Sequence, residues 1–260
     1  MNIEILVSTM NRKVDDLSSL VDKMKIRSKA IIINQTDTIG YSSEHNSEMF
    51  SYTERGVGKS RNSALLRAKG DICLMADDDM VYVAGYEEVV KKAYEKYTDA
   101  DFIVFNVRVH YPDRIVERVS KPGRVRFFNS LKYGTVTFSF KRNAILRENV
   151  FFSLLFGGGA KYSSGEDTLF LWTCLKKGLK VYAEETIIAD VYNYESSWFK
   201  GYNEKFYKDK GALFKALEPK WHYLLNLQLA VRKRKEYGSK KSILEILKIM
   251  NIGAEEFKNL

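Results

Sequence analysis

The chain has 260 residues, of which 45% are hydrophobic and 29% charged. Its longest apolar runs are well short of the ~20 residues of a membrane-spanning helix, which excludes an integral membrane protein of that kind. The formal charge of +9 comes mostly from residues 200–260, which hold 14 Lys and Arg against 7 Asp and Glu. A basic end of this kind suits nucleic acid, an anionic membrane face, or a plain solvated surface.

The first half of the chain alternates predicted strands and helices. Short apolar runs bounded by polar residues indicate buried strands, and apolar residues at helical spacing indicate helices. We predict strands at residues 3–8, 30–35 and 72–75, helices at 14–24 and about 63–68, and a polar loop from residue 36 to about Met49. Because strand, helix and strand follow one another, a mostly parallel, doubly wound sheet is expected.

The second half continues this pattern and then becomes helical. We predict a helix at 86–97, strands at 101–109 and 135–142, a strand pair or extended segment at 180–191, and helices beyond residue 198, including 242–250. The run at 135–142 alternates apolar and polar residues, which is typical of a half-exposed or antiparallel strand. With only three prolines in the chain, the border that we expect near residue 200 is weakly marked.

The start of the chain and its cysteines indicate where the protein works. No basic and apolar leader precedes Ile3, so a cytoplasmic protein is expected. Cys73 lies in a predicted buried strand and Cys174 in a predicted helix. Two such cysteines fit reduced core thiols better than a disulfide framework.

Three consecutive aspartates follow the predicted strand at 72–75. Asp77, Asp78 and Asp79 then stand at the carboxyl end of this strand, where open α/β sheets bind ligands. An arbitrary acidic triplet is more often a solvated turn, but a buried strand holds these carboxylates close together, and a divalent cation relieves their repulsion. Oxygen ligands favour Mg²⁺ or Mn²⁺, ions that commonly bridge to substrate phosphates. The triplet therefore predicts a metal-bound diphosphate.

The sequence GVGKS at residues 56–60 offers an alternative, since it resembles part of the P-loop of nucleoside triphosphatases. That motif needs a glycine five positions before the glycine of GKS, and Thr53 stands there. The loop also lacks a strong strand before it. We therefore do not favour a P-loop.

A second acidic centre follows a loop rich in glycine and serine, from Gly157 to Gly165. Glu166 and Asp167 stand in the first turn of the helix predicted after this loop. Carboxylates there are stabilised by the helix dipole, so simple capping is the alternative to a catalytic role.

These two centres carry a family resemblance. The stretch ERGVGKSRNSALLRAKGDICLMADDDMVY from Glu54, followed by SGEDTLFLWTCLKKG, resembles the family 2 glycosyltransferases of the GT-A fold, of the type that assembles bacterial surface polysaccharides. Their pattern reads roughly N-x-G-x-x-x-A-R-N-x-x-x-x-x-A-x-G, an apolar strand, D-x-D, and a later G-E-D before a helix. LVSTMNR resembles their first strand and turn, and AIIINQTD their second strand.

The resemblance covers about residues 3 to 200. It implies a Rossmann-like GT-A catalytic domain over residues 1–200, with a mostly parallel central sheet and a small antiparallel part. We expect residues 201–260 to form a basic helical C-terminal extension.

The resemblance also implies which residues hold a nucleotide-sugar donor. Arg61 would contact the base or the diphosphate, because a guanidinium in the helix faces the phosphates. Asp78 would reach the ribose. The base pocket would be lined by residues that follow the first and second strands, namely Ser8, Thr9, Asn34 and Gln35.

The remaining acids would serve metal and catalysis. By the resemblance, Asp79 would ligate Mn²⁺ or Mg²⁺, with Asp77 as a second or water-mediated ligand, and Asp167 would be the general base. Sugar transfer with inversion needs one carboxylate to take the proton of the acceptor hydroxyl, while a metal neutralises the departing diphosphate. The chain supplies a separate acidic centre for each task. We therefore predict an inverting, metal-dependent glycosyltransferase that uses a UDP-sugar.

The sequence departs from the family pattern at three places, which affects the contacts expected for the base and the metal. The first strand has Ser8, Thr9 and Met10 where relatives often carry the proline and tyrosine of PxYN, and the second strand has amides where acids are common. Many relatives also have a histidine after the G-E-D helix. The corresponding segment IADVYNYESSW has none, so no third metal ligand is assigned.

The acceptor is predicted from aromatic and basic residues near the C-terminus. Trp198, Phe199 and Tyr202 suit stacking against a sugar ring, with packing of the tail onto the core as the alternative. Trp221, Tyr223 and the basic run at 232–235 suit contact with anionic lipid headgroups. A lipid-linked sugar acceptor at the inner face of the membrane would explain such a surface.

Two other functions are alternatives to a glycosyltransferase. A sugar nucleotidyltransferase has a related fold, but a glycine-rich, lysine-containing signature is expected after its first strand, and LVSTMNR has no glycine. The other rival is a non-catalytic basic protein that binds nucleic acid or membrane, which would show salt-sensitive nucleic-acid affinity without turnover. Nucleic acid is not the partner that we expect.

Overall fold

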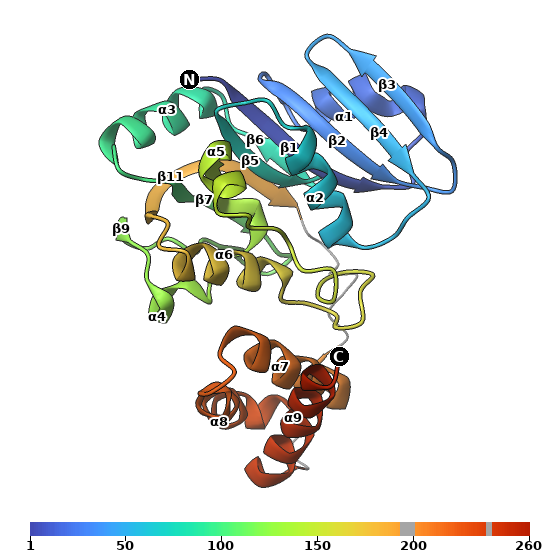
Figure 1. Ribbon diagram of the computed structural model, residues 1–260. Helices are drawn as coiled ribbons and strands as arrows, with labels where there is room; N and C mark the ends of the chain where they lie inside the picture. The colour runs from blue at the N-terminus through green and yellow to red at the C-terminus, as the bar shows by residue number, and fades with distance from the viewer. Residues whose placement is uncertain (193–200, 238–240) are drawn as a thin grey trace.

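The computed structural model describes residues 1–192, 201–237 and 241–260, and it has a central sheet between two layers of helices (Figure 1). The sheet has 11 strands, nine of them in the order β3-β4-β2-β1-β5-β10-β7-β11-β6, with β8 on β7 and β9 on β11. The strands are β1 (Ile3–Met10), β2 (Lys29–Gln35), β3 (Gly40–Glu44), β4 (Ser47–Tyr52), β5 (Ile72–Asp77), β6 (Met80–Tyr82), β7 (Phe102–His110), β8 (Ile115–Val116), β9 (Gly123–Arg124), β10 (Phe138–Lys141) and β11 (Val181–Tyr192).

Nine helices are assigned within the described residues, six before the gap at 193–200 and three after it. They are α1 (Leu17–Lys23), α2 (Val57–Arg67), α3 (Tyr86–Lys96), α4 (Phe127–Ser130), α5 (Arg142–Arg147), α6 (Glu166–Lys176), α7 (Glu204–Leu217), α8 (His222–Lys233) and α9 (Ile243–Lys258). Within the described ranges, no helix is both long enough and apolar enough to span a bilayer.

The sheet is mostly parallel in its first half, as predicted. β1 pairs in parallel with both β2 and β5, and β4 pairs in parallel with β2. β10 lies antiparallel between β5 and β7, which confirms the antiparallel character predicted for residues 135–142. Because β1 and β5 are parallel neighbours, their carboxyl ends meet at one edge of the sheet.

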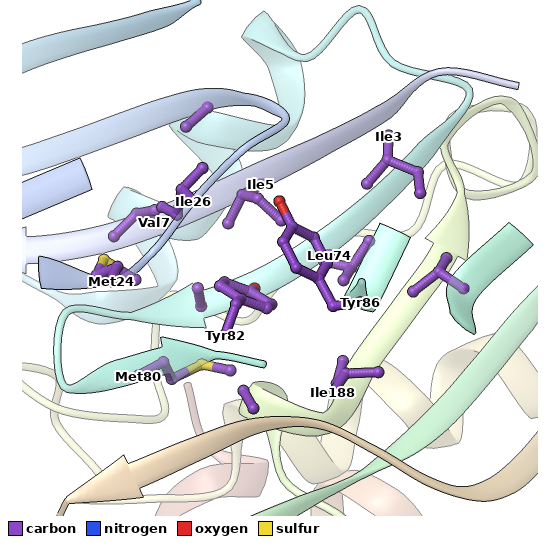
Figure 2. Packing of buried hydrophobic residues seen from close by; sticks show 14 of the residues in the cluster. Ile3, Ile5, Val7, Met24, Ile26, Leu74, Met80, Tyr82, Tyr86 and Ile188 are labelled. Carbon is purple, nitrogen blue, oxygen red and sulfur yellow. The ribbon is translucent and has the colours of Figure 1, made fainter. Parts of the chain in front are cut away.

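Alternating residues of the strands fill two hydrophobic clusters on opposite faces. Ile3, Ile5 and Val7 of β1 pack with buried residues of α1 and α3, as Figure 2 shows for part of this cluster. Leu6 points to the opposite face and packs with buried residues of α2, α5 and α6. Strand residues point to alternate faces, and a strand with helices on both faces is apolar on both sides. Cys73 and Cys174 are buried free thiols, as predicted.

Two sequence predictions are corrected, and for a third the structure selects the extended segment over the strand pair. The polar loop before Met49 is instead a hairpin of β3 and β4, in which Met49 is buried while the serines and glutamates conceal the strand pattern. The helix predicted at about 63–68 begins earlier, at Val57. The segment 180–191 is one strand, β11, whose pairing with β7 is interrupted by irregularities between Glu184 and Ala189.

The C-terminal helices α7, α8 and α9 pack around a third hydrophobic cluster (Figure 1). This cluster includes Phe156, Tyr162 and Trp172, so it reaches the loop before α6 and α6 itself. The helical character predicted for residues 201–260 is confirmed. A division of the chain at residue 200 stays a prediction, and the shared cluster means that the two parts are packed against each other.

Candidate active site

A cavity of about 1000 Å³ opens at the carboxyl ends of β1 and β5. Its walls come from segments that are far apart in the sequence. The first half of the chain contributes Ser8, Thr9, Met10, Gln35, Arg55, Gly56, Val57, Ser60, Arg61, Asp77, Asp78 and Asp79. Later segments contribute Val109, Tyr111, Gly134, Thr135, Val136, Gly158, Gly159, Ser163, Ser164, Gly165, Glu166, Asp167 and Val191.

The three aspartates lie at one side of this cavity. Asp77 is the last residue of β5, and Asp78 and Asp79 form the turn to β6. Oδ2 of Asp78 accepts hydrogen bonds from Oγ1 of Thr9 at 2.6 Å and from Nη2 of Arg12 at 2.9 Å. These bonds fix the Asp78 carboxylate against the turn that follows β1.

Asp79 carries a carboxylate oxygen without a hydrogen-bond partner. Its Oδ1 is buried and has no partner among the described residues. Burial, together with the negative charges of Asp77 and Asp78, raises the pKa of Asp79 to about 6. Such a group is destabilised as a carboxylate, and a cation beside it would restore the ionised form.

The donor set fits a metal only in part. Across residues 1–192, 201–237 and 241–260, no three His, Cys, Asp or Glu side chains converge into a complete metal cage. Mg²⁺ is usually bound through one or two carboxylates, substrate phosphates and water rather than by an all-protein cage. Asp79, with Asp77 nearby, fits an ion of that kind.

Arg61 connects the aspartates to the second acidic centre. Its Nη1 donates to Oε1 of Glu166 at 2.6 Å, and its Nη2 donates to Oδ1 of Asp77 at 3.2 Å. The guanidinium also lies over the ring of Phe152, 5.5 Å from the centroid. Burial lowers the pKa of Arg61, but the charges of Asp77, Glu166 and Asp167 outweigh it and raise the pKa overall. Arg61 therefore stays a cation between three acids.

Asp167 stands in the first turn of α6 and lines the same cavity. Its Oδ1 accepts from the backbone N–H of Thr168 at 2.6 Å and from Oγ1 of the same residue at 3.2 Å. Oδ2 faces Gly134, where an added Cβ would lie 3.3 Å away. Burial and the charge of Glu166 raise the pKa of Asp167 to about 6, with Arg61 acting in the opposite direction. A carboxylate with such a pKa suits a general base near neutral pH.

The residues predicted to line the base pocket are brought together in part. Ser8, Thr9 and Gln35 line the cavity, but Asn34 does not. The Asn34 side chain is fully buried, where it bonds the backbone of Arg12 and Oγ of Ser51. Because neighbouring strand residues point to opposite faces, only one of this pair faces the cavity. The placement predicted for Asn34 is therefore corrected.

Several residues in the cavity or bonded to its walls were not predicted. Arg12 bonds Asp78, Arg55 bonds Asp37 at 2.6 Å, and the buried Oγ1 of Thr135 has no partner within the described residues. The position of Arg12, directly after the first strand and opposite an acidic triplet, was a signal available in the sequence. Nothing in the sequence marks Thr135, since it enters the cavity from a 3₁₀ turn.

The aromatic residues predicted to bind the acceptor are only partly described. Trp198 and Phe199 lie outside the described residues. Tyr202 packs among the C-terminal helices, with its ring 5.0 Å from that of Phe206 and under the ammonium group of Lys233. Tyr202 also packs against the third hydrophobic cluster, which includes Phe156 and Trp172. This favours the alternative role, packing of the C-terminal part onto the core, over stacking against a sugar ring.

No protein-family profile and no curated protein matches the chain. Several solved structures do match the chain. The structure of residues 1–349 of S. aureus TarS in complex with UDP-GlcNAc matches with a TM-score of 0.67 and 15% identity, covering 99% of this chain and 80% of that one. The same fragment with UDP gives 0.64 and 15%, with coverage of 94% and 77%. A third structure of the fragment gives 0.60 and 12%, with coverage of 100% and 92%.

Similarity at this level of identity establishes the fold. The chain has the predicted mixed α/β architecture of the GT-A type, with a mostly parallel central sheet and helices at the C-terminus. The antiparallel part is larger than predicted, since β3, β6, β8, β9 and β10 all pair antiparallel with their neighbours.

Proposed function

We propose that the chain is a glycosyltransferase that moves a sugar from a nucleotide diphosphate donor, expected to be a UDP-sugar, to a hydroxyl group of a glycan or lipid-linked saccharide. The observation that carries this proposal is one cavity lined by two separate acidic centres, Asp77 to Asp79 at the end of β5 and Asp167 at the start of α6. The fold similarity to TarS in complex with UDP-GlcNAc and with UDP supports a nucleotide-sugar donor.

The reaction that suits this arrangement is a single displacement with inversion. The acceptor oxygen attacks the anomeric carbon, the bond from that carbon to the diphosphate oxygen breaks, and the nucleoside diphosphate leaves with the electron pair. Asp167 takes the proton of the acceptor hydroxyl. Its place on α6, in the same cavity as the aspartates but on a separate element, supports this role, since the base and the group that stabilises the leaving diphosphate must be different carboxylates.

The donor would lie between β1, β5 and α2. Ser8, Thr9 and Gln35 are the polar cavity residues proposed to contact the base, and Asp78 to contact the ribose. Oδ2 of Asp78 is already bonded to Thr9 and Arg12, so its other carboxylate oxygen would reach the ribose hydroxyls. Arg61 would donate hydrogen bonds to the diphosphate through the N–H groups that Asp77 and Glu166 do not occupy.

The cofactor proposed is Mn²⁺ or Mg²⁺, held by Asp79 with Asp77 as a second or water-mediated ligand. When bound, such an ion would neutralise charge on the departing diphosphate. The buried, unpartnered Oδ1 of Asp79 supports this assignment. Arg61 bonds Asp77, which leaves Asp79 as the principal ligand.

Binding and catalysis are tested separately with two variants. Saturation by UDP and Mn²⁺ should stabilise the wild-type chain, by roughly 2.7 kcal/mol at a ligand concentration 100 times the Kd. Asp79→Ala should lose the part of this shift that depends on Mn²⁺, whereas Asp22→Ala, an exposed acid on α1, should keep it. Asp167→Asn should keep the shift and lose sugar transfer or donor hydrolysis.

The outcomes that contradict the proposal are distinct. An unchanged Mn²⁺-dependent shift in Asp79→Ala would refute the metal assignment, and near-normal turnover by Asp167→Asn would remove it from the base role. If a panel of nucleotide sugars gave neither stabilisation nor turnover, the glycosyltransferase proposal would fail. Formation of a nucleotide sugar from a nucleoside triphosphate would favour the nucleotidyltransferase rival. Salt-sensitive nucleic-acid binding without turnover would favour the basic binding protein.

Contact with an anionic membrane surface at the cytoplasmic face is a second part of the proposal. α8 and the residue directly before it expose an apolar stripe with residues spaced by three or four positions, Trp221 (58% exposed), Leu224 (53%), Leu227 (45%) and Val231 (57%). Exposed basic residues, Lys220 and Arg232, flank the stripe at its two ends. Apolar side chains flanked by cations suit the interface of a bilayer that contains anionic lipid.

Co-sedimentation with vesicles tests this surface. The double variant Leu224→Glu, Leu227→Glu should lose binding to vesicles that contain phosphatidylglycerol. Leu244→Glu, at an exposed position on α9, should bind as the wild type does. Equal binding by the double variant and the wild type, or no wild-type binding at all, would contradict membrane contact through α8.

A further inference from the structure

The loop before Asp167 is held from outside by a helix of the C-terminal part. Oδ2 of Asp209, on α7, accepts hydrogen bonds from the backbone N–H of Ser163 at 2.9 Å and from Oγ of the same residue at 2.5 Å. Lys205, one turn earlier, donates to the same oxygen at 2.7 Å. The Asp209 residue is only 6% exposed. A buried carboxylate with these donors fixes the position of Ser163 firmly, because bonds to a charged acceptor are the stronger kind.

The next residue of α7 contacts the next residue of the loop. Nζ of Lys210 donates to Oγ of Ser164 at 3.2 Å. Burial lowers the pKa of Lys210, and the negative charges of Asp167, Glu166 and Asp209 act against that effect. The ammonium group therefore lies within electrostatic reach of the acids of the active site. Lys210 does not line the cavity itself, whereas Ser163 and Ser164 do.

α7 also packs against the residue that directly precedes α6. Gly165 has a φ of +118° and stands directly before α6. A Cβ added to Gly165 would lie 2.6 Å from Cδ1 of Leu213 on α7. Three consecutive residues, Ser163 to Gly165, thus contact one face of α7, and the chain enters α6 from there.

We propose that α7 is a positioning element of the active site, in which Asp209 and Lys210 hold the loop before α6 and thereby the Asp167 carboxylate. The role of Asp167 in this inference rests on the proposed function. Lys210 also supplies a positive charge on the side of the loop away from the cavity, which favours the ionised base. The C-terminal helices are then needed for catalysis itself and not only for contact with a surface.

The test compares two lysine variants of the full chain. Lys210→Met removes the proposed contact, and Lys215→Met removes the same charge at a site on α7 where, among the described residues, Nζ bonds the nearby carbonyl of Pro219. Amide hydrogen exchange at residues 158–168 should be faster in Lys210→Met and unchanged in Lys215→Met. The acid limb of the kcat profile should move up by roughly 0.5–1 pH unit in Lys210→Met alone, because a neighbouring cation no longer favours the carboxylate.

Such a shift lowers kcat about three- to tenfold at a pH below the midpoint, since the ionised fraction there falls tenfold per unit. The KM for the donor should change little, and Lys210→Arg should restore the profile. A purely structural role would lower activity together with thermal stability and leave the midpoint in place.

Each outcome decides the proposal. Exchange at 158–168 and a pH profile that both match the wild type in Lys210→Met would overturn it. If Lys210→Met fails to fold, Ser164→Ala removes the acceptor from the loop side without altering α7. Because the Lys210 charge remains in that variant, hydrogen exchange at 158–168 is then the readout that decides. Hydrogen exchange needs no turnover, so an inactive wild-type chain would refute the proposed function while exchange still decides whether α7 holds the loop.

Discussion

Nη1 of Arg61 lies 2.6 Å from Oε1 of Glu166, and this bond joins two segments that are 105 positions apart in the sequence. Because Nη2 of the same guanidinium also reaches Asp77, one side chain connects the aspartates at the end of β5 to the segment that carries Asp167. Glu166 in turn accepts the backbone N–H of Gly165 with its other oxygen, at 3.1 Å. The relative position of the two acidic centres is therefore set by a buried ion-pair network.

Replacing Arg61 should destabilise the fold as well as weaken donor binding. Its side chain is 5% exposed, and its removal would leave two paired carboxylates without their cation. Breaking a buried pair in this way costs about 3–5 kcal/mol. Urea unfolding of Arg61→Met at pH 7.5 should show a loss of this size, whereas Arg27→Met, at an exposed position, should match the wild type. A loss below about 1 kcal/mol would mean that solvent already screens the network.

Asp167→Asn should stabilise the chain at high pH while abolishing transfer. The folded-state pKa of Asp167 is about 6, above the ~3.9 of an unfolded aspartate, so the folded state binds this proton more tightly. Ionisation therefore costs stability as the pH rises from ~4 through 6, and the full cost is present above 6. The variant should gain about 1–2 kcal/mol at pH 8, allowing for screening, and little at pH 4.5.

Thermal unfolding across this pH range checks the stability of Asp167→Asn, with Asp113→Asn as an exposed control. A gain that does not depend on pH would show that the asparagine packs better for a reason unrelated to charge. A loss at pH 8 would show that the carboxylate is held by Thr168 and Arg61 more strongly than burial opposes it.

The rate of transfer should depend on pH through the same group. A base with a pKa of about 6 is mostly ionised at pH 7.5 and mostly protonated at pH 5. We expect kcat to fall about tenfold per unit well below pH 6 and to level off above pH 7. Measurement at saturating donor and Mn²⁺ keeps Asp79 ionised, so that the limb reports Asp167. A flat profile between pH 5 and 8 would contradict the role of Asp167 as the base.

The parts of the site that could be predicted from sequence are those set by local pattern. A buried apolar run followed at once by acids placed Asp77, Asp78 and Asp79 at a strand end, and the structure has them there. Glu166 and Asp167 were predicted in the first turn of a helix, where the structure has them. Strand alternation could also have separated Asn34 from Gln35, since neighbours in a strand face opposite sides.

The parts that could not be predicted depend on contacts between distant segments. Glu166 was considered only as a helix-capping residue, because nothing local reveals that Arg61 bonds it. Lys210 reaches the loop before α6 from a helix beyond residue 200, and nothing in the sequence distinguishes it from the other lysines of that helix, Lys205, Lys208 and Lys215. β4 was missed for a related reason, since its pairing with β2 and the burial of Met49 stabilise a strand whose serines and glutamate resemble a loop.

Close packing of α7 on α9 gives a last prediction, in which two effects have opposite signs. In an exposed helix, alanine is more favourable than glycine by about 1 kcal/mol. At Gly211, however, an added Cβ would lie 1.8 Å from the carbonyl oxygen of Met250, and at Gly253 it would lie 1.9 Å from that of Lys208. The helices can accept a methyl group there only by moving apart, at a cost of about 1–3 kcal/mol or more.

Gly211→Ala should therefore destabilise the C-terminal helices despite its better helix propensity. Because α7 holds Ser163 and Ser164, transfer activity should fall with it. Circular dichroism during thermal unfolding would measure the loss of stability. Gln228→Ala, at an exposed position on α8, is the control in which helix propensity acts alone. A Gly211→Ala chain that melts higher than the wild type would mean that α7 and α9 cross at a greater distance than in this structure. The contacts of α7 with the loop before α6, which depend on the same packing, would then be contradicted too.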